Sequence, residues 1–252
     1  MPHPFRSVVL DEVASTNRDA FALATAGEPG PLWVVGRRQT AGRGRSGRTW
    51  ASEPGNLYAS LLIRLACPPA VVPQIALLSG VATADAIAQA ADVAPAGLRL
   101  KWPNDVLIGQ AKCAGILAES IAESGSVVAV VGIGINLAWH PANLGRAATH
   151  LTEHGIQIAA DAMLELLDAA MQRWLGVWND GANFAHVREA WLERAGPVGE
   201  SCTANTGAER IAGEFLGLDA AGALMLRDDE GRHRTVTFGD VALGAAPSGG
   251  PG

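Results

Sequence analysis

The sequence predicts an α+β protein that ends in a small β module. Up to Gly199, segments with helical apolar spacing alternate with short runs rich in β-forming residues. Beyond Gly199 only short β-like segments remain, separated by the turn sequences DAAG and DDEG. A hydrophobic content of 48% with 17% charged residues is typical of a chain that folds almost throughout.

The first predicted elements are a helix and two strands. The segment STNRDAFALATAG, residues 15–27, has an apolar stripe at helical spacing, with Ser15 or Thr16 as its N-cap. LWVVG at 32–36 and LYASLLIRL at 57–65 are apolar runs of β-forming residues and predict strands. The segment between these runs is therefore expected to be a loop that joins two strands.

The middle of the chain predicts one helix followed by four strands. The apolar spacing over 72–91 is helical and rich in alanine. The expected strands are 98–102, 106–109, 114–122 and 127–138. The turn sequence PND separates the first two strands, and ESGS separates the last two, which predicts a hairpin.

Two further helices are expected before the β module, over 161–178 and 184–195, with Asp161 as the cap of the first. The first carries a stripe that is typical of core packing rather than of a ligand site: Leu164, Leu167, Met171, Trp174 and Trp178. The expected strands of the module lie in 201–206, 210–218, 222–228 and 234–243. The Gly- and Pro-rich segment 245–252 is expected to be disordered.

Charge, cysteines and hydropathy disfavour several classes of protein. A net charge of −6, from 25 acidic and 19 basic residues, argues against a general nucleic-acid-coating protein, which must neutralise many phosphates. Cys67, Cys113 and Cys202 lie far apart and in no zinc-type spacing, which fits a reducing compartment. The sequence has no signal-peptide pattern and no long uninterrupted apolar run. We therefore expect a cytoplasmic protein with no membrane partner.

The segment QTAGRGRSGRTW, residues 39–50, concentrates three arginines and three glycines between Gly42 and Arg48. Glycines let backbone N–H groups approach a ligand closely, and guanidinium groups hold carboxylates and phosphates through paired hydrogen bonds. The segment is not a P-loop, because GxxxxGK[ST] is absent, and GIGIN lacks the third glycine of a dinucleotide fingerprint. The charge pattern alone leaves an anion pocket, an RNA-binding loop and a solvated loop open.

A second polar cluster, KWPNDVLIGQAK, places Lys101, Asn104, Asp105 and Lys112 on one strand–turn–strand segment. An amide can hydrogen-bond a base edge, and a carboxylate can support a metal ion or an ordered water. Alternatively, Asn104 and Asp105 simply form the turn and Lys112 is a surface lysine. The spacing leaves both interpretations open.

The motifs STN, QTAGRGRSGRTW, KWPND, KCAGILAES and GIGIN occur in this order, and the chain resembles the biotin protein ligases from about Asp11 to the C-terminal β module. The resemblance implies a mixed β-sheet flanked by helices over 1–196, of the class II synthetase-like type, and a small SH3-like β-barrel over 197–244. It also implies ATP-dependent formation of biotinyl-5'-AMP. Transfer of biotin to a lysine of a biotin carboxyl carrier protein domain follows. ATP, Mg²⁺ and biotin are the implied cofactor and substrates, and a monomer or homodimer is expected.

The resemblance assigns roles to individual residues. The expected biotin contacts are Ser15, Thr16, Gln39, Gly42, Arg43, Arg45, Tyr58, Lys112, Gly115, Leu117, Gly132 and Gly134. The expected ATP and AMP contacts are Arg43, Arg45, Arg48, Trp50, Asn104, Lys112 and Asn136, with Trp50 stacked on adenine. Lys112, Arg43 and Arg45 are the expected catalytic residues, and Lys101 is the weaker candidate. Asp105 is expected to anchor Mg²⁺ directly or through water. For Tyr58, packing in the core is an alternative.

Three further expectations concern departures from the family pattern and the loop. Ser46 stands where a basic residue is common, and Cys113 where a bulkier aliphatic residue is usual; Cys113 is either a small buried hydrophobe or an oxidation-sensitive thiol. The STN motif begins at Ser15, so we expect a form without the N-terminal DNA-binding domain and without a nucleic-acid partner. Specific binding to a biotin operon promoter would refute this. The segment from Gly42 to Arg48 is expected to become ordered over bound biotin or adenylate.

Two other functions compete with this interpretation. A lipoate protein ligase has the same fold and adenylation chemistry but takes a linear dithiolane acid. A non-catalytic RNA-binding protein would bind phosphates through the segment from Gly42 to Arg48, called the arginine loop below. It would show steeply salt-dependent RNA binding. The pair of motifs GRGRSGRTW and KWPND favours biotin over lipoate, and the acidic net charge and the position of the loop between two apolar strands favour a pocket over RNA binding.

Overall fold

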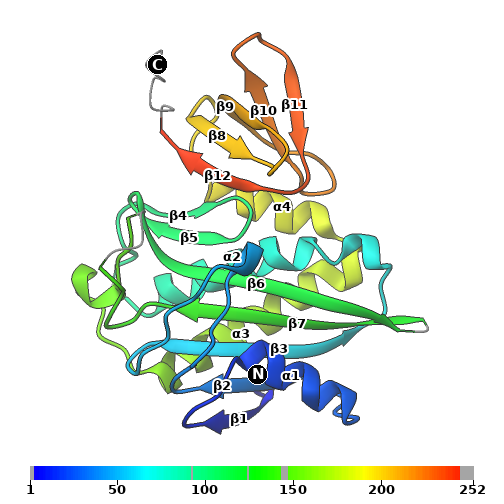
Figure 1. The fold of residues 1–252 in the computed structure, drawn as a ribbon, viewed down its shortest axis with the longest axis vertical. Helices are drawn as coiled ribbons and strands as arrows, with labels where there is room; N and C mark the ends of the chain where they lie inside the picture. Colours follow the sequence, from blue (N-terminus) through cyan, green and yellow to red (C-terminus); the bar gives the residue numbers. More distant parts are fainter. Residues whose placement is uncertain (1–2, 92, 124, 143–146, 245–252) are drawn as a thin grey trace.

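The computed structural model of the protein describes residues 3–91, 93–123, 125–142 and 147–244. The segment predicted to be disordered, 245–252, lies outside the described residues. The larger part is a seven-stranded sheet in the order β1-β2-β3-β7-β6-β5-β4 (Figure 1). Its strands are β1 (Arg6–Leu10), β2 (Leu32–Gly36), β3 (Leu57–Leu65), β4 (Leu98–Lys101), β5 (Asp105–Ile108), β6 (Ala111–Glu123) and β7 (Ser126–Ile135). Only β1 and β2 pair in parallel, so the sheet is mixed, as predicted.

Helices cover both faces of this sheet. The helices are α1 (Thr16–Thr25), α2 (Gln74–Gln89), α3 (Ala160–Trp178) and α4 (Phe184–Glu193). The main hydrophobic core lies between the sheet and α2, α3 and α4 and continues into the C-terminal module, and a smaller cluster lies under α1 on the opposite face. Figure 1 shows the arrangement of these helices. The predicted stripe of α3 packs in or against the main core, as expected.

The alternation of side chains along β3 decides which face receives the polar residues. Leu57, Leu61 and Ile63 point into the main core. Successive side chains of a strand point to opposite faces, so Tyr58 and Ser60 lie on the face that carries α1. Register places the glycines of β7 opposite them, with Tyr58 paired to Gly134 and Ser60 to Gly132. This face therefore combines polar side chains with glycine backbone.

The C-terminal module is an antiparallel sheet in the order β11-β10-β9-β8-β12. Its strands are β8 (Ser201–Asn205), β9 (Arg210–Leu218), β10 (Leu224–Asp228), β11 (His233–Val236) and β12 (Asp240–Leu243). The expected SH3-like module is thus present, and within the described residues its sheet is open, with β11 and β12 as its two edges. The segment 234–243, expected as one run, is two strands separated around Gly239, whose φ of +144° favours glycine.

One strand was missed, one predicted cap was confirmed in position only, and one predicted cap was wrong. The strand β1 was not predicted, and four of its five residues are exposed, so no alternating pattern marks it. Ser15 is the N-cap residue of α1, but its side chain makes no capping hydrogen bond. Asp161 lies within the first turn of α3, and Ala159 is the N-cap residue. Within the described residues, no helix is both long and apolar enough to cross a membrane.

Candidate functional site

A cleft of about 500 Å³ opens on the α1 face of the large sheet, between the arginine loop and strand β12. It is in the size range of small-molecule sites. Most residues singled out from the sequence line it: Ser15, Thr16, Gln39, Arg43, Arg45, Arg48, Trp50, Tyr58, Asn104, Asp105, Lys112, Gly115, Leu117, Gly132 and Gly134. Residues that are up to 119 positions apart in the chain thus meet in one place because strand register brings them to the same face.

Gly42 and Asn136 are not among the residues that line this cleft. A Cβ atom at Gly42 would lie 2.4 Å from the carbonyl oxygen of Trp50, so glycine is needed where the loop crosses itself. Asn136 lines a small neighbouring hollow together with Trp50 and Lys112, and its amide donates to the carbonyl oxygen of Thr149 at 3.0 Å. Both residues shape the edges of the cleft.

One end of the cleft is a fixed network of neutral polar groups. The Gln39 Oε1 atom accepts hydrogen bonds from the backbone N–H of Thr16, at 2.9 Å, and from its hydroxyl, at 3.2 Å. The Gln39 amide donates to Ser52 Oγ at 2.8 Å, and Ser60 Oγ lies 2.7 Å from Thr16 Oγ1. These contacts fix the amide and hydroxyl orientations, so this end suits a neutral polar group better than an ion.

Tyr58 lies on the same wall and is almost fully buried. Its hydroxyl donates to the carbonyl oxygen of Glu53 at 2.8 Å. Burial raises the pKa of this phenol to about 12, so it stays neutral at physiological pH. Tyr58 both lines the cleft and packs in the fold, so the two interpretations of its role are compatible.

The indole of Trp50 lies over Gly115 and Gly134, whose backbone forms the floor of the cleft and is called the glycine floor below. A Cβ atom at Gly134 would lie 2.6 Å from Trp50 Cε2, and one at Gly115 would lie 3.1 Å from Trp50 Cζ3. The indole N–H of Trp50 is buried and lacks a hydrogen-bond partner among the described residues. A buried donor of this kind is available to a hydrogen-bond acceptor in the cleft.

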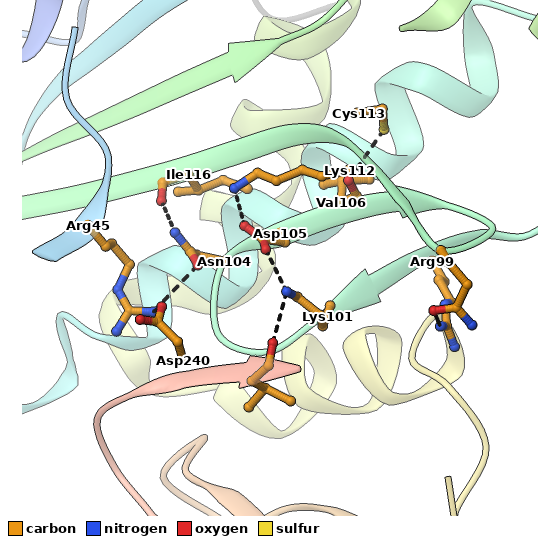
Figure 2. A network of polar contacts seen from close by, with 12 residues as sticks. Arg45, Arg99, Lys101, Asn104, Asp105, Val106, Lys112, Cys113, Ile116 and Asp240 are labelled. Atoms are coloured by element: carbon orange, nitrogen blue, oxygen red, sulfur yellow. Dashed lines mark hydrogen bonds and ion pairs between the residues drawn. The ribbon is translucent and has the colours of Figure 1, made fainter. Parts of the chain in front are cut away.

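The arginine loop closes on the C-terminal module. Arg45 donates to the carbonyl oxygen of Gly239 at 3.0 Å, and Arg48 forms an ion pair with Asp240. Asp240 is the first residue of β12, so the module supplies one wall of the cleft (Figure 2). At the loop tip, Ser46 adopts a φ of +54°, a conformation uncommon for residues other than glycine. Ordering of the loop by a ligand stays a prediction.

The charged centre of the cleft is Asp105 between two lysines (Figure 2). Its Oδ1 atom contacts the Nζ atom of Lys112, and its Oδ2 atom lies 2.9 Å from Nζ of Lys101. Burial raises the pKa of the Asp105 carboxyl, but the ammonium groups of Lys112 and Lys101 outweigh that effect and lower it to about 2. The Lys112 Nζ atom also lies 5.2 Å from the centre of the Trp50 ring.

Asp105 does not fit the expected role of a direct Mg²⁺ ligand. Both of its oxygens are engaged by ammonium groups, and a divalent cation at the same carboxylate would be repelled by both lysines. Asp105 instead fits the role of an anion that positions Lys112. Next to it, Asn104 donates to the carbonyl oxygen of Ile116 at 2.6 Å, which ties the turn to β6.

Comparison with known proteins agrees with this architecture. Residues 10–136 match the model of the biotin/lipoate A/B protein ligase family. The chain belongs to this family. Residues 198–244 match the biotin protein ligase C-terminal domain, which places the chain among the biotin protein ligases.

Individual relatives of this ligase cover nearly all of its length. A biotin–[acetyl-CoA-carboxylase] ligase of Paracoccus denitrificans is 40% identical over 89% of this chain and 95% of its own. A bifunctional ligase/repressor of Bacillus subtilis is 35% identical over 93% of this chain and 73% of its own. The solved structure of the Aquifex aeolicus biotin protein ligase in complex with biotin and ATP has a TM-score of 0.79 at 27% identity. The match covers 96% of this chain and 99% of that one.

Sequence reasoning missed two residues of the ligase that shape the cleft. The amide of Asn17 donates to the carbonyl oxygen of Leu117 at 3.2 Å and to Glu119 at 2.7 Å, and it accepts from Ser60 at 2.6 Å. Its position within the motif STN was the available signal. Asp240 gave no signal, because it lies 192 residues from the arginine that it pairs with.

Cys113 of the ligase is a buried hydrophobe rather than a reactive thiol. It is fully buried, and burial raises its pKa to about 12, whereas thiolate is the reactive form. We expect Cys113 to escape alkylation by iodoacetamide at pH 8 in the folded ligase and to be alkylated after denaturation. Peptide mass spectrometry measures this. Rapid labelling of Cys113 in the folded protein would restore the hypothesis of an oxidation-sensitive site.

Proposed function

We propose that this ligase activates biotin as biotinyl-5'-AMP with ATP and transfers biotin to a specific lysine of a biotin carboxyl carrier protein domain. In the first step a biotin carboxylate oxygen attacks the α-phosphorus of ATP and pyrophosphate leaves. In the second step the acceptor lysine amine attacks the acyl carbon and AMP leaves. Family membership and the names of the relatives support this reaction.

The observation that carries the proposal is the difference in polarity between the two ends of the cleft. One end holds neutral hydroxyl and amide groups around Gln39, and the other holds cationic groups that include Arg43, Arg45 and Lys112. A neutral urea matches the first end, and a carboxylate with a triphosphate matches the second. Bringing two anions together is unfavourable unless fixed cations face them in a site from which water is excluded.

On the biotin side, Ser15, Thr16 and Gln39 bind the ureido group, with the backbone of Gly115 as a further partner. Tyr58 and Leu117 supply the apolar wall. Gly132 and Gly134 let the bicyclic ring approach the strand backbone. The fixed hydrogen bonds of Gln39 support this assignment, because they hold its amide in one orientation.

On the nucleotide side, Arg43, Arg45 and Lys112 face the reacting carboxylate and phosphates, and Trp50 stacks on adenine after leaving the glycine floor. The unsatisfied indole N–H of Trp50 supports such a rearrangement. Arg48, Asn104 and Asn136 complete the nucleotide contacts. Mg²⁺ is proposed to enter with ATP on its phosphate oxygens, because Asp105 is engaged by two lysines.

The proposal also covers the domain boundary, the acceptor protein, the compartment and the oligomeric state. The boundary between the catalytic domain, 1–196, and the β domain, 197–244, is proposed between α4 and β8. The acceptor is the carrier domain of a biotin-dependent carboxylase, and the ligase works in the cytoplasm as a monomer or homodimer. The net charge of −6 supports the absence of a nucleic-acid partner.

A pyrophosphate-release assay followed by transfer to a purified carrier domain tests the function. We expect pyrophosphate release that depends on both biotin and ATP, and then a biotinylated lysine on the carrier. If neither pyrophosphate nor a biotinylated carrier forms while active acceptor is present, the proposal is contradicted. A thermal-shift comparison tests the lipoate alternative: biotin should raise the Tm more than lipoate does, and the reverse order would favour lipoate.

Replacing Gly132 with Ala is expected to weaken biotin binding. The new Cβ atom would lie 2.2 Å from Oδ1 of Asn17, and the hydrogen bonds of Asn17 to Ser60, Leu117 and Glu119 resist its retreat. Losing part of this network should raise the Kd for biotin by about tenfold, measured by isothermal titration calorimetry. Gly176→Ala is the matched control, because nothing lies within 4 Å of its added Cβ atom. Equal affinity in both variants would show that the network does not support the biotin pocket.

A further inference from the structure

A cluster of ligand-type side chains lies outside the cleft. Within the described parts of the chain, His140, His150 and Glu153 form the one group of three whose metal-ligating atoms all lie within 4.8 Å of one another. The Nδ1 atoms of the two histidines are 3.0 Å apart, and a Glu153 oxygen lies 3.6 Å from Nδ1 of His150. Both histidines are half-buried and the glutamate is more exposed.

The carboxylate of Glu153 is held in place by its neighbours. Its Oε2 atom accepts hydrogen bonds from Thr149 Oγ1 at 2.5 Å and from the backbone N–H of His150 at 3.4 Å. This leaves Oε1 directed at the histidine pair. Hydrogen bonds of this kind fix the orientation of metal-ligating carboxylates.

The backbone around the cluster is tied to the strand that carries the cleft. Leu151 N–H donates to the carbonyl oxygen of Asn136 at 3.0 Å, and the Thr152 hydroxyl donates to that of Leu137 at 2.8 Å. His150 and Glu153 are therefore presented by a segment anchored to the end of β7, not by a freely moving loop. This preorganisation lowers the cost of assembling a metal site.

The two Nδ1 atoms face one another at hydrogen-bonding distance, and the His150 side chain also accepts a hydrogen bond from the backbone N–H of Glu153. A divalent ion can take the place of these contacts, because an imidazole Nδ1 without a proton is a metal ligand. A tetrahedral ion with metal–nitrogen distances of about 2.0–2.1 Å places two nitrogens about 3.3 Å apart. The observed 3.0 Å requires only a slight opening of the pair.

We propose that His140, His150 and Glu153 bind one divalent transition-metal ion of the Zn²⁺ type, with water in the fourth position. Two imidazoles with one carboxylate are a Zn²⁺ ligand set, whereas Mg²⁺ prefers oxygen ligands alone. The site is therefore distinct from the Mg²⁺ that accompanies ATP. The ion would link His140 to the segment 149–153. In this segment the Thr149 N–H donates to the carbonyl oxygen of Lys112 at 3.0 Å.

Titration of the chelator-treated ligase with Co²⁺, followed by competition with Zn²⁺, tests the proposal. We expect one Co²⁺ per chain with the intense visible bands of tetrahedral coordination, displaced by one Zn²⁺ and not by Mg²⁺. Replacing a ligand costs at least as much as the 10–100-fold typical of groups that only support ligands, so His140→Ala and His150→Ala should each weaken binding by about 100-fold or more. His186→Ala, which removes an exposed histidine elsewhere, should bind as tightly as the wild type.

Folding controls accompany the metal titration, and two results would overturn the proposed metal site. Circular dichroism of the metal-free variants checks their fold, and Glu153→Gln, at a largely exposed position, provides a variant that keeps both imidazoles and should lose about tenfold in affinity. Absence of Co²⁺ and Zn²⁺ binding by the wild type overturns the proposal. Binding that is unchanged in the His150→Ala and Glu153→Gln variants overturns it equally, because the ion would then lie elsewhere.

Discussion

Replacing Lys112 with Ala is expected to lower the rate of biotinyl-5'-AMP formation by about 10²–10³-fold, the loss typical of removing one group that stabilises transition-state charge. The Nζ atom of Lys112 lies in the cleft, positioned by Asp105. It can therefore face the charge that develops when carboxylate and α-phosphate meet. Pyrophosphate release at saturating biotin and ATP measures the effect.

The fold of the Lys112→Ala variant should survive, because Asp105 keeps Lys101 as a partner at 2.9 Å. Lys101→Ala is the matched control, since it removes a cation from the same carboxylate. Lys101 also donates to the carbonyl oxygen of Val241 at 3.0 Å, so its loss should loosen the contact with β12 more than the chemistry. Near-normal turnover of a folded Lys112→Ala variant, or a larger loss in Lys101→Ala, would contradict the assignment of Lys112 as the catalytic lysine.

Replacing Asp105 with Asn is expected to lower the free energy of unfolding by about 3–5 kcal/mol, because removing one partner leaves buried charges without compensation. The variant keeps two ammonium groups facing one another, with side chains that are only 18% and 10% exposed for Lys101 and Lys112. Urea denaturation followed by circular dichroism measures the change. The double variant Asp105→Asn, Lys112→Met should recover part of the loss, because it also removes the repulsion.

The contribution of the Asp105 carboxylate to the free energy of unfolding should depend on pH. The pKa of Asp105 is lowered from 3.8 to about 2 in the folded protein, so its stabilising contribution is complete above about pH 4 and is lost as the pH falls toward 2. The shift corresponds to about 2 kcal/mol. The difference in unfolding free energy between wild type and Asp105→Asn should therefore shrink over this range. A difference independent of pH between 2 and 5 would show that the carboxylate charge is not responsible.

Much of the fold could be predicted because several strands are apolar runs bounded by turn residues. β2, β3 and β9 have the bounds expected from the sequence, and the hairpin of β6 and β7 was predicted at ESGS. The strand β1 could not be predicted, since a mostly exposed edge strand carries no alternation. Ser15 is the expected N-cap residue of α1 but makes no side-chain capping bond, and Asp161 lies inside α3, because capping depends on side-chain geometry that composition does not specify.

Some residues of the candidate site could be predicted from the sequence, and others could not. The arginine loop, Asn104 and Lys112 could be singled out because unusual residue types are concentrated in short motifs. The ion pair of Arg48 with Asp240 could not, because its partners are 192 residues apart. The metal cluster could not either, because His140 and the pair His150 and Glu153 are separated in sequence and follow no metal-binding spacing.

The sequence by itself determined the class of fold, the terminal β module and the groups available for chemistry: three arginines, two lysines, an amide and a row of glycines. Only the tertiary structure decided that Asp105 is shared by Lys101 and Lys112, and that Asp240 pairs with Arg48 at the edge of the cleft. The physical reason is that residue type and local spacing set propensity and charge. Distances between charges arise from strand register and packing over the whole chain, and electrostatic energies depend on those distances.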